Sequence, residues 1–138
     1  MQVSVSSYSF SQLKKDPVEI IALAKELGFT AVEYTGVDRE TALRVREEGE
    51  RLGLPIICYT VWANFLAAAS LEEEVQRVHG QVDIAEILGV KKMRHDATAG
   101  FNAPQNKCNS FDQALPLLAK GCRMVTEYAA AKGIETMI

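Results

Sequence analysis

The sequence lacks a basic surplus and long apolar runs. It carries 15 lysines and arginines against 18 aspartates and glutamates, a formal net charge of −3. Sequence-independent binding of nucleic acid needs an excess of positive charge, so we predict no nucleic-acid partner. The longest apolar stretches are short, for example Pro55 to Cys58, against roughly 20 residues for a membrane-spanning helix. We therefore predict no membrane segment, and the first ten residues do not resemble a secretory signal.

The sequence also has few cysteines and lacks the common nucleotide-binding motifs. The cysteines Cys58, Cys108 and Cys122 are odd in number and widely spaced, which predicts neither a disulfide framework nor a CxxC motif. This usage is typical of a reducing cytoplasm, where we place the protein. The motifs GxGxxG, P-loop, HExxH and GxSxG are missing, so nothing indicates a nucleotide cofactor.

What the sequence does contain is a repeated junction. Four times a helix-like segment closes on glycine and an apolar run follows: LGFTAVEY, LGLPIICY, LGVKKMRH and KGIETMI, with Gly28, Gly53, Gly89 and Gly133. Glycine suits the left-handed conformation at a helix end, and the β-branched and aromatic residues that follow suit strands. The repeat predicts helices that alternate with strands.

Local signals give the approximate bounds of these elements. Asp16 with Glu19, and Ser70 with Glu73, are capping-box pairs that begin two helices. We predict helices over about 16–27, 38–52 and 70–88, and a fourth from Ser110, with a short turn near Pro116 before its main part. We predict strands over Val3–Tyr8, Thr30–Thr35, Ile56–Trp62, Lys92–Asp96 and Ile134–Ile138.

This alternation indicates right-handed βαβ units and an α/β fold with a mainly parallel sheet. Two architectures fit it: an open doubly wound, flavodoxin-like sheet, and half of a TIM (β/α)₈ barrel. A length of 138 residues suits the open sheet, whereas an end at Ile138 within an uncovered fifth strand favours the half barrel. We expect a single partial barrel domain over 1–138, with four βα units plus a fifth strand.

Five segments carry a family resemblance: 6–10 (SSYSF), 26–33 (ELGFTAVE), 88–96 (LGVKKMRHD), 110–116 (SFDQALP) and 128–134 (YAAAKGI). In order and spacing the chain resembles the N-terminal half of the xylose-isomerase-like TIM-barrel superfamily, within it the sugar phosphate isomerase/epimerase proteins. The resemblance implies metal-assisted isomerisation or epimerisation of a sugar or sugar phosphate in the full-length form. The superfamily also includes apurinic endonucleases, but two histidines and a negative net charge argue against that branch.

The resemblance also implies a divalent metal such as Mn, Mg, Zn or Co. It places the usual ligands at the end of the fifth strand and on strands six to eight, which lie beyond Ile138. We therefore expect no metal site and no activity in this chain alone. The alternative hypothesis is a non-catalytic half barrel that binds or assembles with another copy, because exposed edge strands favour association.

Polar and aromatic residues stand where the predicted strands end, which is where barrel chemistry takes place. We predict His95 and Glu33 as catalytic residues, because imidazole titrates near neutral pH and a carboxylate can orient a hydroxyl. We predict five substrate-binding residues: Tyr8, Phe10, Trp62, Arg94 and Asp96. Phe10 and Trp62 could form the wall against which a sugar stacks, and Arg94 could hold a phosphate.

Structural explanations stay open for several of these residues. Glu33 and Arg94 could simply pair inside a barrel, since buried charges must be matched. In a regular strand Arg94 and Asp96 share one face and His95 takes the other. Either the strand ends early, or His95 packs outward under a helix. Trp62 could belong to the core as well as to a pocket wall.

Overall fold

The computed structural model describes residues 3–67, 70–101, 103–104, 106, 108 and 110–138. It contains one parallel sheet of five strands: β1 (Ser4–Ser6), β2 (Ala31–Thr35), β3 (Ile56–Val61), β4 (Lys92–His95) and β5 (Glu135–Met137). The strands lie side by side in chain order, β1-β2-β3-β4-β5, and every neighbouring pair is parallel. Among the described residues, no helix is long and apolar enough to cross a membrane.

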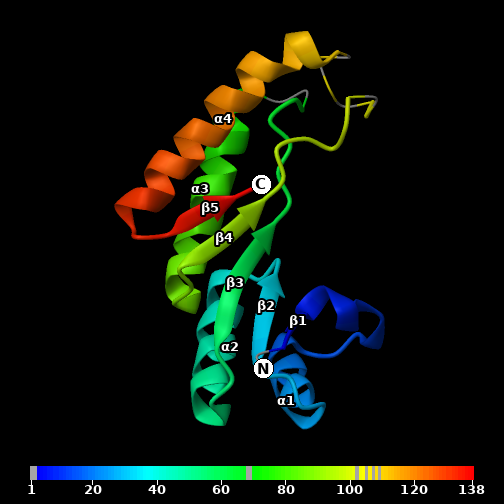
Figure 1. Ribbon diagram of the computed structural model, residues 1–138, viewed down its shortest axis with the longest axis vertical. Coiled ribbons are helices and arrows are strands. Elements are labelled where there is room, and N and C mark those ends of the chain that lie inside the picture. The colour runs from blue at the N-terminus through cyan, green and yellow to red at the C-terminus, as the bar shows by residue number, and fades with distance from the viewer. Residues whose placement is uncertain (1–2, 68–69, 102, 105, 107, 109) are drawn as a thin grey trace.

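This sequential order distinguishes the two architectures. A doubly wound sheet reverses its strand order, so that its first strand lies inside the sheet with helices on both faces. Here β1 lies at the edge, and right-handed crossovers in one direction bring α1 to α4 to the same face of the sheet (Figure 1). The expectation of half a TIM barrel is confirmed, and the open flavodoxin-like alternative is wrong.

The helices begin and end close to the predicted bounds. They are α1 (Pro17–Glu26), α2 (Arg39–Leu52), α3 (Leu71–Leu88) and α4 (Phe111–Ala131). Both predicted capping boxes form, at Asp16 and at Ser70. The four junction glycines all adopt positive φ, between 60° and 85°, as the left-handed helix end requires.

Two predictions of local structure are wrong. The first strand ends at Ser6 rather than Tyr8, and a 3-10 helix, η1 (Ser7–Leu13), follows at once. Ser6 caps that helix, because its hydroxyl accepts the N–H of Tyr8. The turn expected near Pro116 does not form, since α4 runs through it. Proline removes only one helical hydrogen bond here, from the exposed second residue of the helix, where water can solvate the carbonyl.

Strand alternation gives the sheet one buried and one open side. The side chains that face the helices are buried, including Val32, Tyr34, Tyr59, Met93 and His95. The other face carries alternate residues such as Glu33, Thr60 and Arg94, which stay partly or fully accessible. In a complete barrel this open face is the interior, so the half barrel presents its inner wall to solvent.

Candidate functional site

A cavity of about 800 Å³ lies where the first four strands end. Each strand or the loop directly after it contributes to the wall. The lining residues are Ser6, Tyr8, Glu33, Thr35, Gly36, Thr60, Trp62, Arg94 and Asp96. The carboxyl ends of the strands are where barrel enzymes bind their ligands. Five of the seven residues singled out from the sequence therefore lie around one hollow.

Two aromatic side chains stand at the rim of this strand-end cavity. Trp62 follows β3 directly and is 56% exposed, and Tyr8 in η1 is 71% exposed. Large aromatic rings usually bury most of their surface, so exposed rings on a concave wall offer apolar faces to a ligand. Trp62 is thus a wall residue and not a core residue.

The charged groups of the cavity come from β2, from β4 and from the residue directly after β4. Arg94 donates to the Asp96 carboxylate at 3.2 Å, and both side chains stay partly exposed. The Glu33 carboxylate accepts a hydrogen bond from the Ser4 hydroxyl at 3.3 Å. In the part of the chain that the structure describes, Arg94 pairs with Asp96, and the pairing with Glu33 considered above does not form.

His95 and Phe10 lie outside the strand-end cavity. His95 is fully buried on the helix-facing side of β4, which is the second of the two arrangements considered above. Its Nδ1 lies 2.8 Å from the Asp96 carbonyl oxygen and must donate there, and Phe65 packs edge-on against its ring. Phe10 in η1 is half-buried against the core and lines a separate hollow of about 170 Å³ beside Tyr34.

The cavity also contains hydroxyl residues that were not predicted from the sequence, among them Thr35 and Thr60. Thr60 lies two residues before Trp62, and Thr35 two residues after Glu33. Alternate strand residues share a face, so the period of two could have found both of them. Asn64, which is fully buried, lies in the loop after β3, where no strand period applies.

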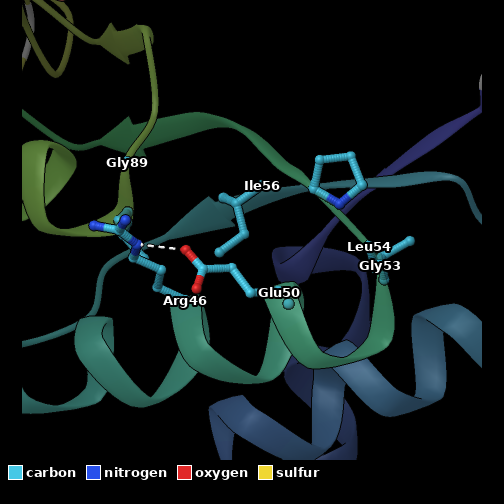
Figure 2. Close-up of a pocket in the computed structure, with 9 residues that line it drawn as sticks. Arg46, Glu50, Gly53, Leu54, Ile56 and Gly89 are labelled. Carbon is cyan, nitrogen blue, oxygen red and sulfur yellow. Dashed lines mark hydrogen bonds and ion pairs between the residues drawn. The ribbon is translucent and has the colours of Figure 1, made fainter.

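Another pocket lies at the opposite end of the sheet, between α2 and the end of α3 (Figure 2). It measures about 400 Å³, and an ion pair between Arg46 and Glu50 at 2.8 Å crosses its wall. Arg46 also donates to the carbonyl of Ile87 in the last turn of α3 at 3.3 Å. A cation on the last carbonyls of a helix stabilises the helix end, so we assign Arg46 to the packing of α2 against α3.

The described residues do not fit a divalent metal. No three histidine, cysteine, aspartate or glutamate side chains among them come together as ligands. The Asp96 carboxylate is already paired with Arg94, and His95 faces away from the cavity. The three cysteines are free, and burial raises the pKa of the Cys58 and Cys122 thiols, which disfavours the thiolate that metals require.

Comparisons with known proteins identify the fold. No family model and no curated protein matches the sequence. Among solved structures, a probable 3-DHS dehydratase involved in petrobactin synthesis, from Bacillus anthracis, is similar with a TM-score of 0.77 and 19% identity. The similarity covers 100% of this chain and 52% of that protein. A D-psicose 3-epimerase is similar with a TM-score of 0.74 and 12% identity, over 99% of this chain and 51% of its own.

A third similar structure is named as an endonuclease and not for a sugar. An AP endonuclease of family 2 from Brucella melitensis gives a TM-score of 0.66 at 17% identity, over 86% of this chain and 47% of its own. At these identities the likeness shows the fold alone, that of half a TIM barrel. The chain spans about half the length of these three structures. Because one of these structures is named as a nuclease, the absence of a nucleic-acid partner for this chain stays a prediction.

Proposed function

We propose that the strand-end cavity binds a sugar or sugar phosphate, and that this half barrel serves an isomerase or epimerase reaction in the full-length form. One observation carries the proposal: exposed aromatic rings, hydroxyls and charges from four successive strands converge on one hollow. Two of the similar structures, the D-psicose 3-epimerase and a 3-keto-D-glucoside 4-epimerase from E. coli, are named for sugars. Their names support the ligand class proposed here.

The lining suits a polyhydroxylated ligand. The ring of Trp62 can stack on the C–H face of a sugar, while Thr60 and Ser6 offer hydroxyls that donate and accept. Arg94 keeps donors beyond the one bonded to Asp96, because a guanidinium has five N–H groups. Those donors could hold a hydroxyl or a phosphate oxygen of the ligand.

Glu33 is the proposed proton acceptor. It lies on the inner wall opposite Cys58 of β3 and lines the same hollow as Thr60 and Arg94. Its only hydrogen bond within the described part of the chain comes from Ser4. Moving a proton between neighbouring sugar carbons needs such a base within hydrogen-bond reach of the ligand. His95 has a supporting role in this proposal, because its Nδ1–H holds the Asp96 carbonyl beside the cavity.

Calorimetric titration of the 138-residue chain with D-fructose, its 6-phosphate and inorganic phosphate tests the binding. Glu33→Gln removes the charge from the cavity, and the matched control Glu47→Gln removes a charge from the exposed face of α2. A hydrogen bond to a charged group is worth about 1.5–3 kcal/mol, so Glu33→Gln should weaken binding by about tenfold or more and Glu47→Gln should not. No heat with any sugar at tens of millimolar would overturn the proposal.

The alternative, a half barrel that assembles with a second copy, has its own supporting observation. The open face continues into a hollow of about 590 Å³ lined by Ile57 and Met137, which are 43% and 36% exposed. Sedimentation separates the two hypotheses. A monomer that binds sugar supports the first, and a stable dimer without ligand binding supports the second.

A further inference from the structure

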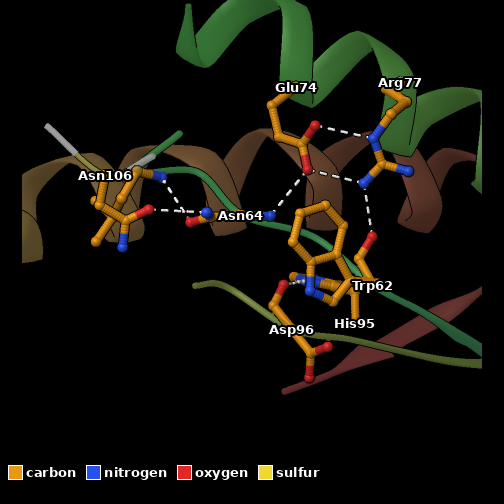
Figure 3. Close-up of polar contacts among 8 residues, drawn as sticks. Trp62, Asn64, Glu74, Arg77, His95, Asp96 and Asn106 are labelled. Carbon is orange, nitrogen blue, oxygen red and sulfur yellow. Dashed lines mark hydrogen bonds and ion pairs between the residues drawn. The ribbon is translucent and has the colours of Figure 1, made fainter. Parts of the chain in front are cut away.

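Two charged residues of α3 hold the loop that carries Trp62 (Figure 3). Arg77 donates from Nη2 to the carbonyl oxygen of Trp62 at 2.6 Å. Glu74 accepts the N–H of Asn64 at 2.8 Å. The same Glu74 oxygen accepts a hydrogen bond from Arg77 at 2.8 Å, so one ion pair spans both loop contacts. The backbone of 62–64 is therefore fastened to the first turns of the helix that follows it.

Arg77 also lies against the indole itself. Its guanidinium carbon is 5.8 Å from the centre of the Trp62 ring. The ring is thus in contact with a cation on one side while it remains 56% exposed at the cavity rim. A cation over an indole face favours one orientation of the ring.

Glu74 is suited to this task because it is largely shielded from solvent, with 11% of its side chain exposed. Burial opposes its charge, but the hydrogen bonds from Arg77 and from the N–H of Asn64 outweigh that effect and hold its pKa below the usual value. The ion pair is therefore intact at neutral pH.

The contacts continue from the first loop into the next one. The side chain of Asn64 is fully buried, donates to the Asn106 side chain at 2.8 Å, and accepts the N–H of Leu66 at 3.2 Å. Phe65 donates to the carbonyl of Ala97 at 2.9 Å. Displacing the 62–64 backbone would consequently disturb the loop after β4, which begins at Asp96 in the cavity wall.

We propose that Arg77 and Glu74 are positioning residues: through the Trp62 carbonyl, the Asn64 N–H and the indole face, they set the orientation of Trp62 and thereby the ligand affinity of the cavity. Neither residue lines the cavity itself. The part of the inference that concerns affinity rests on the proposed function, whereas the part that concerns the orientation of Trp62 does not.

The chain provides a matched control on the preceding helix, α2. Glu48 and Arg51 of α2 have the same three-residue spacing and form an ion pair at 2.6 Å. Arg77→Met and Arg51→Met therefore remove the same charge from equivalent pairs, and only the first lies beside Trp62. Trp62 is the single tryptophan of the chain, so fluorescence reports on it alone.

The experiment measures tryptophan emission, time-resolved anisotropy and D-fructose binding in both variants. Arg77→Met should shift the emission, free the indole to move faster, and weaken sugar binding about three- to tenfold through the lost stacking geometry. Arg51→Met should change none of these. Glu74→Gln, which keeps an acceptor for the Asn64 N–H but loses the charge, should give an intermediate effect and serves if Arg77→Met does not fold.

The outcomes separate the inference from the proposed function. Unchanged emission and anisotropy in folded Arg77→Met and Glu74→Gln would overturn the positioning role, whether or not the parent binds sugar. A parent that binds no sugar would overturn the proposed function, while altered tryptophan anisotropy in Arg77→Met would still support the positioning of Trp62. A parent and an Arg77→Met variant that bind equally well would refute the effect on affinity.

Discussion

Replacing Gly121 with alanine tests how tightly α4 packs on the loop after β3. Gly121 is buried in α4, and a Cβ at this position would lie 2.6 Å from Cγ of Phe65 and 2.8 and 2.9 Å from two further ring atoms. The Phe65 ring is 3% exposed and lies edge-on to His95, with centroids 5.9 Å apart. The ring therefore has little room to move, and either the helix or the loop must shift.

Two opposing contributions determine the change in stability. Alanine is favoured over glycine inside a helix by about 1 kcal/mol, whereas an overpacked methyl group in a core costs about 1–3 kcal/mol. Gly80 in α3 isolates the first contribution, because it is exposed and a Cβ there meets nothing within 4 Å. Gly80→Ala should stabilise the protein by about 0.5–1 kcal/mol. The difference between the two variants should equal the steric cost, about 1–3 kcal/mol.

Urea or thermal unfolding of both variants measures this difference. For a chain of 138 residues the unfolding entropy is about 0.3 kcal/mol per degree, so each kcal/mol shifts Tm by about 3 °C. Gly121→Ala should melt several degrees below Gly80→Ala. Equal stability of the two variants would refute the close packing of α4 on Phe65.

Three further predictions concern single side chains. Ser70→Ala should destabilise the protein by about 1 kcal/mol in chemical unfolding because it removes the capping box of α3, whereas Ser110→Ala, at a helix start without a side-chain cap, should be nearly neutral. Hydrogen bonds from Arg77 and from the N–H of Asn64 outweigh the burial of Glu74 and lower its pKa. The stabilising contribution of Glu74 is therefore present above about pH 4.3 and is lost as the pH falls through its folded-state pKa. Glu74→Gln should therefore lose stability less steeply than the parent in an acid titration from about pH 5 to 3. Burial raises the pKa of Tyr34, so its contribution is present below about pH 10 and is lost at higher pH; Tyr34→Phe should flatten the alkaline loss of stability, and an unchanged profile would contradict the burial of that phenol.

Local signals predicted the four α-helices and the five strands, but not the 3-10 helix η1 or the unbroken course of α4 through Pro116. The capping pairs at Asp16 and Ser70 and the four junction glycines are short-range features, and the structure confirms them. The order of the strands is not local, because it depends on which edge of each strand finds a partner. Residue spacing alone left the open sheet and the half barrel as alternatives, and the position of β1 at the edge decided between them.

The residues of the candidate site could be predicted where the end of a strand could be predicted. The carboxyl ends of β3 and β4 were predicted correctly to within one residue, and this was enough to identify Trp62, Arg94 and Asp96. All three line the cavity. Tyr8 reached the cavity from a 3-10 helix that no pattern indicated. The bond from Arg77 to the Trp62 carbonyl could not be foreseen, since a helix surface pair at this spacing is usually solvated and its backbone partner depends on the path of the loop.

The sequential strand order also governs how the molecule loses structure. Within the described residues, each strand pairs only with the strands next to it in the chain, and each α-helix packs on the next one. This part of the fold therefore behaves as a row of coupled units, similar to a repeat protein. The units at the two ends have one neighbour each, while those around β2, β3 and β4 have two. Amide hydrogen exchange should therefore be slowest in β3 and fastest in β1 and β5, with unfolding that proceeds from both ends toward the middle.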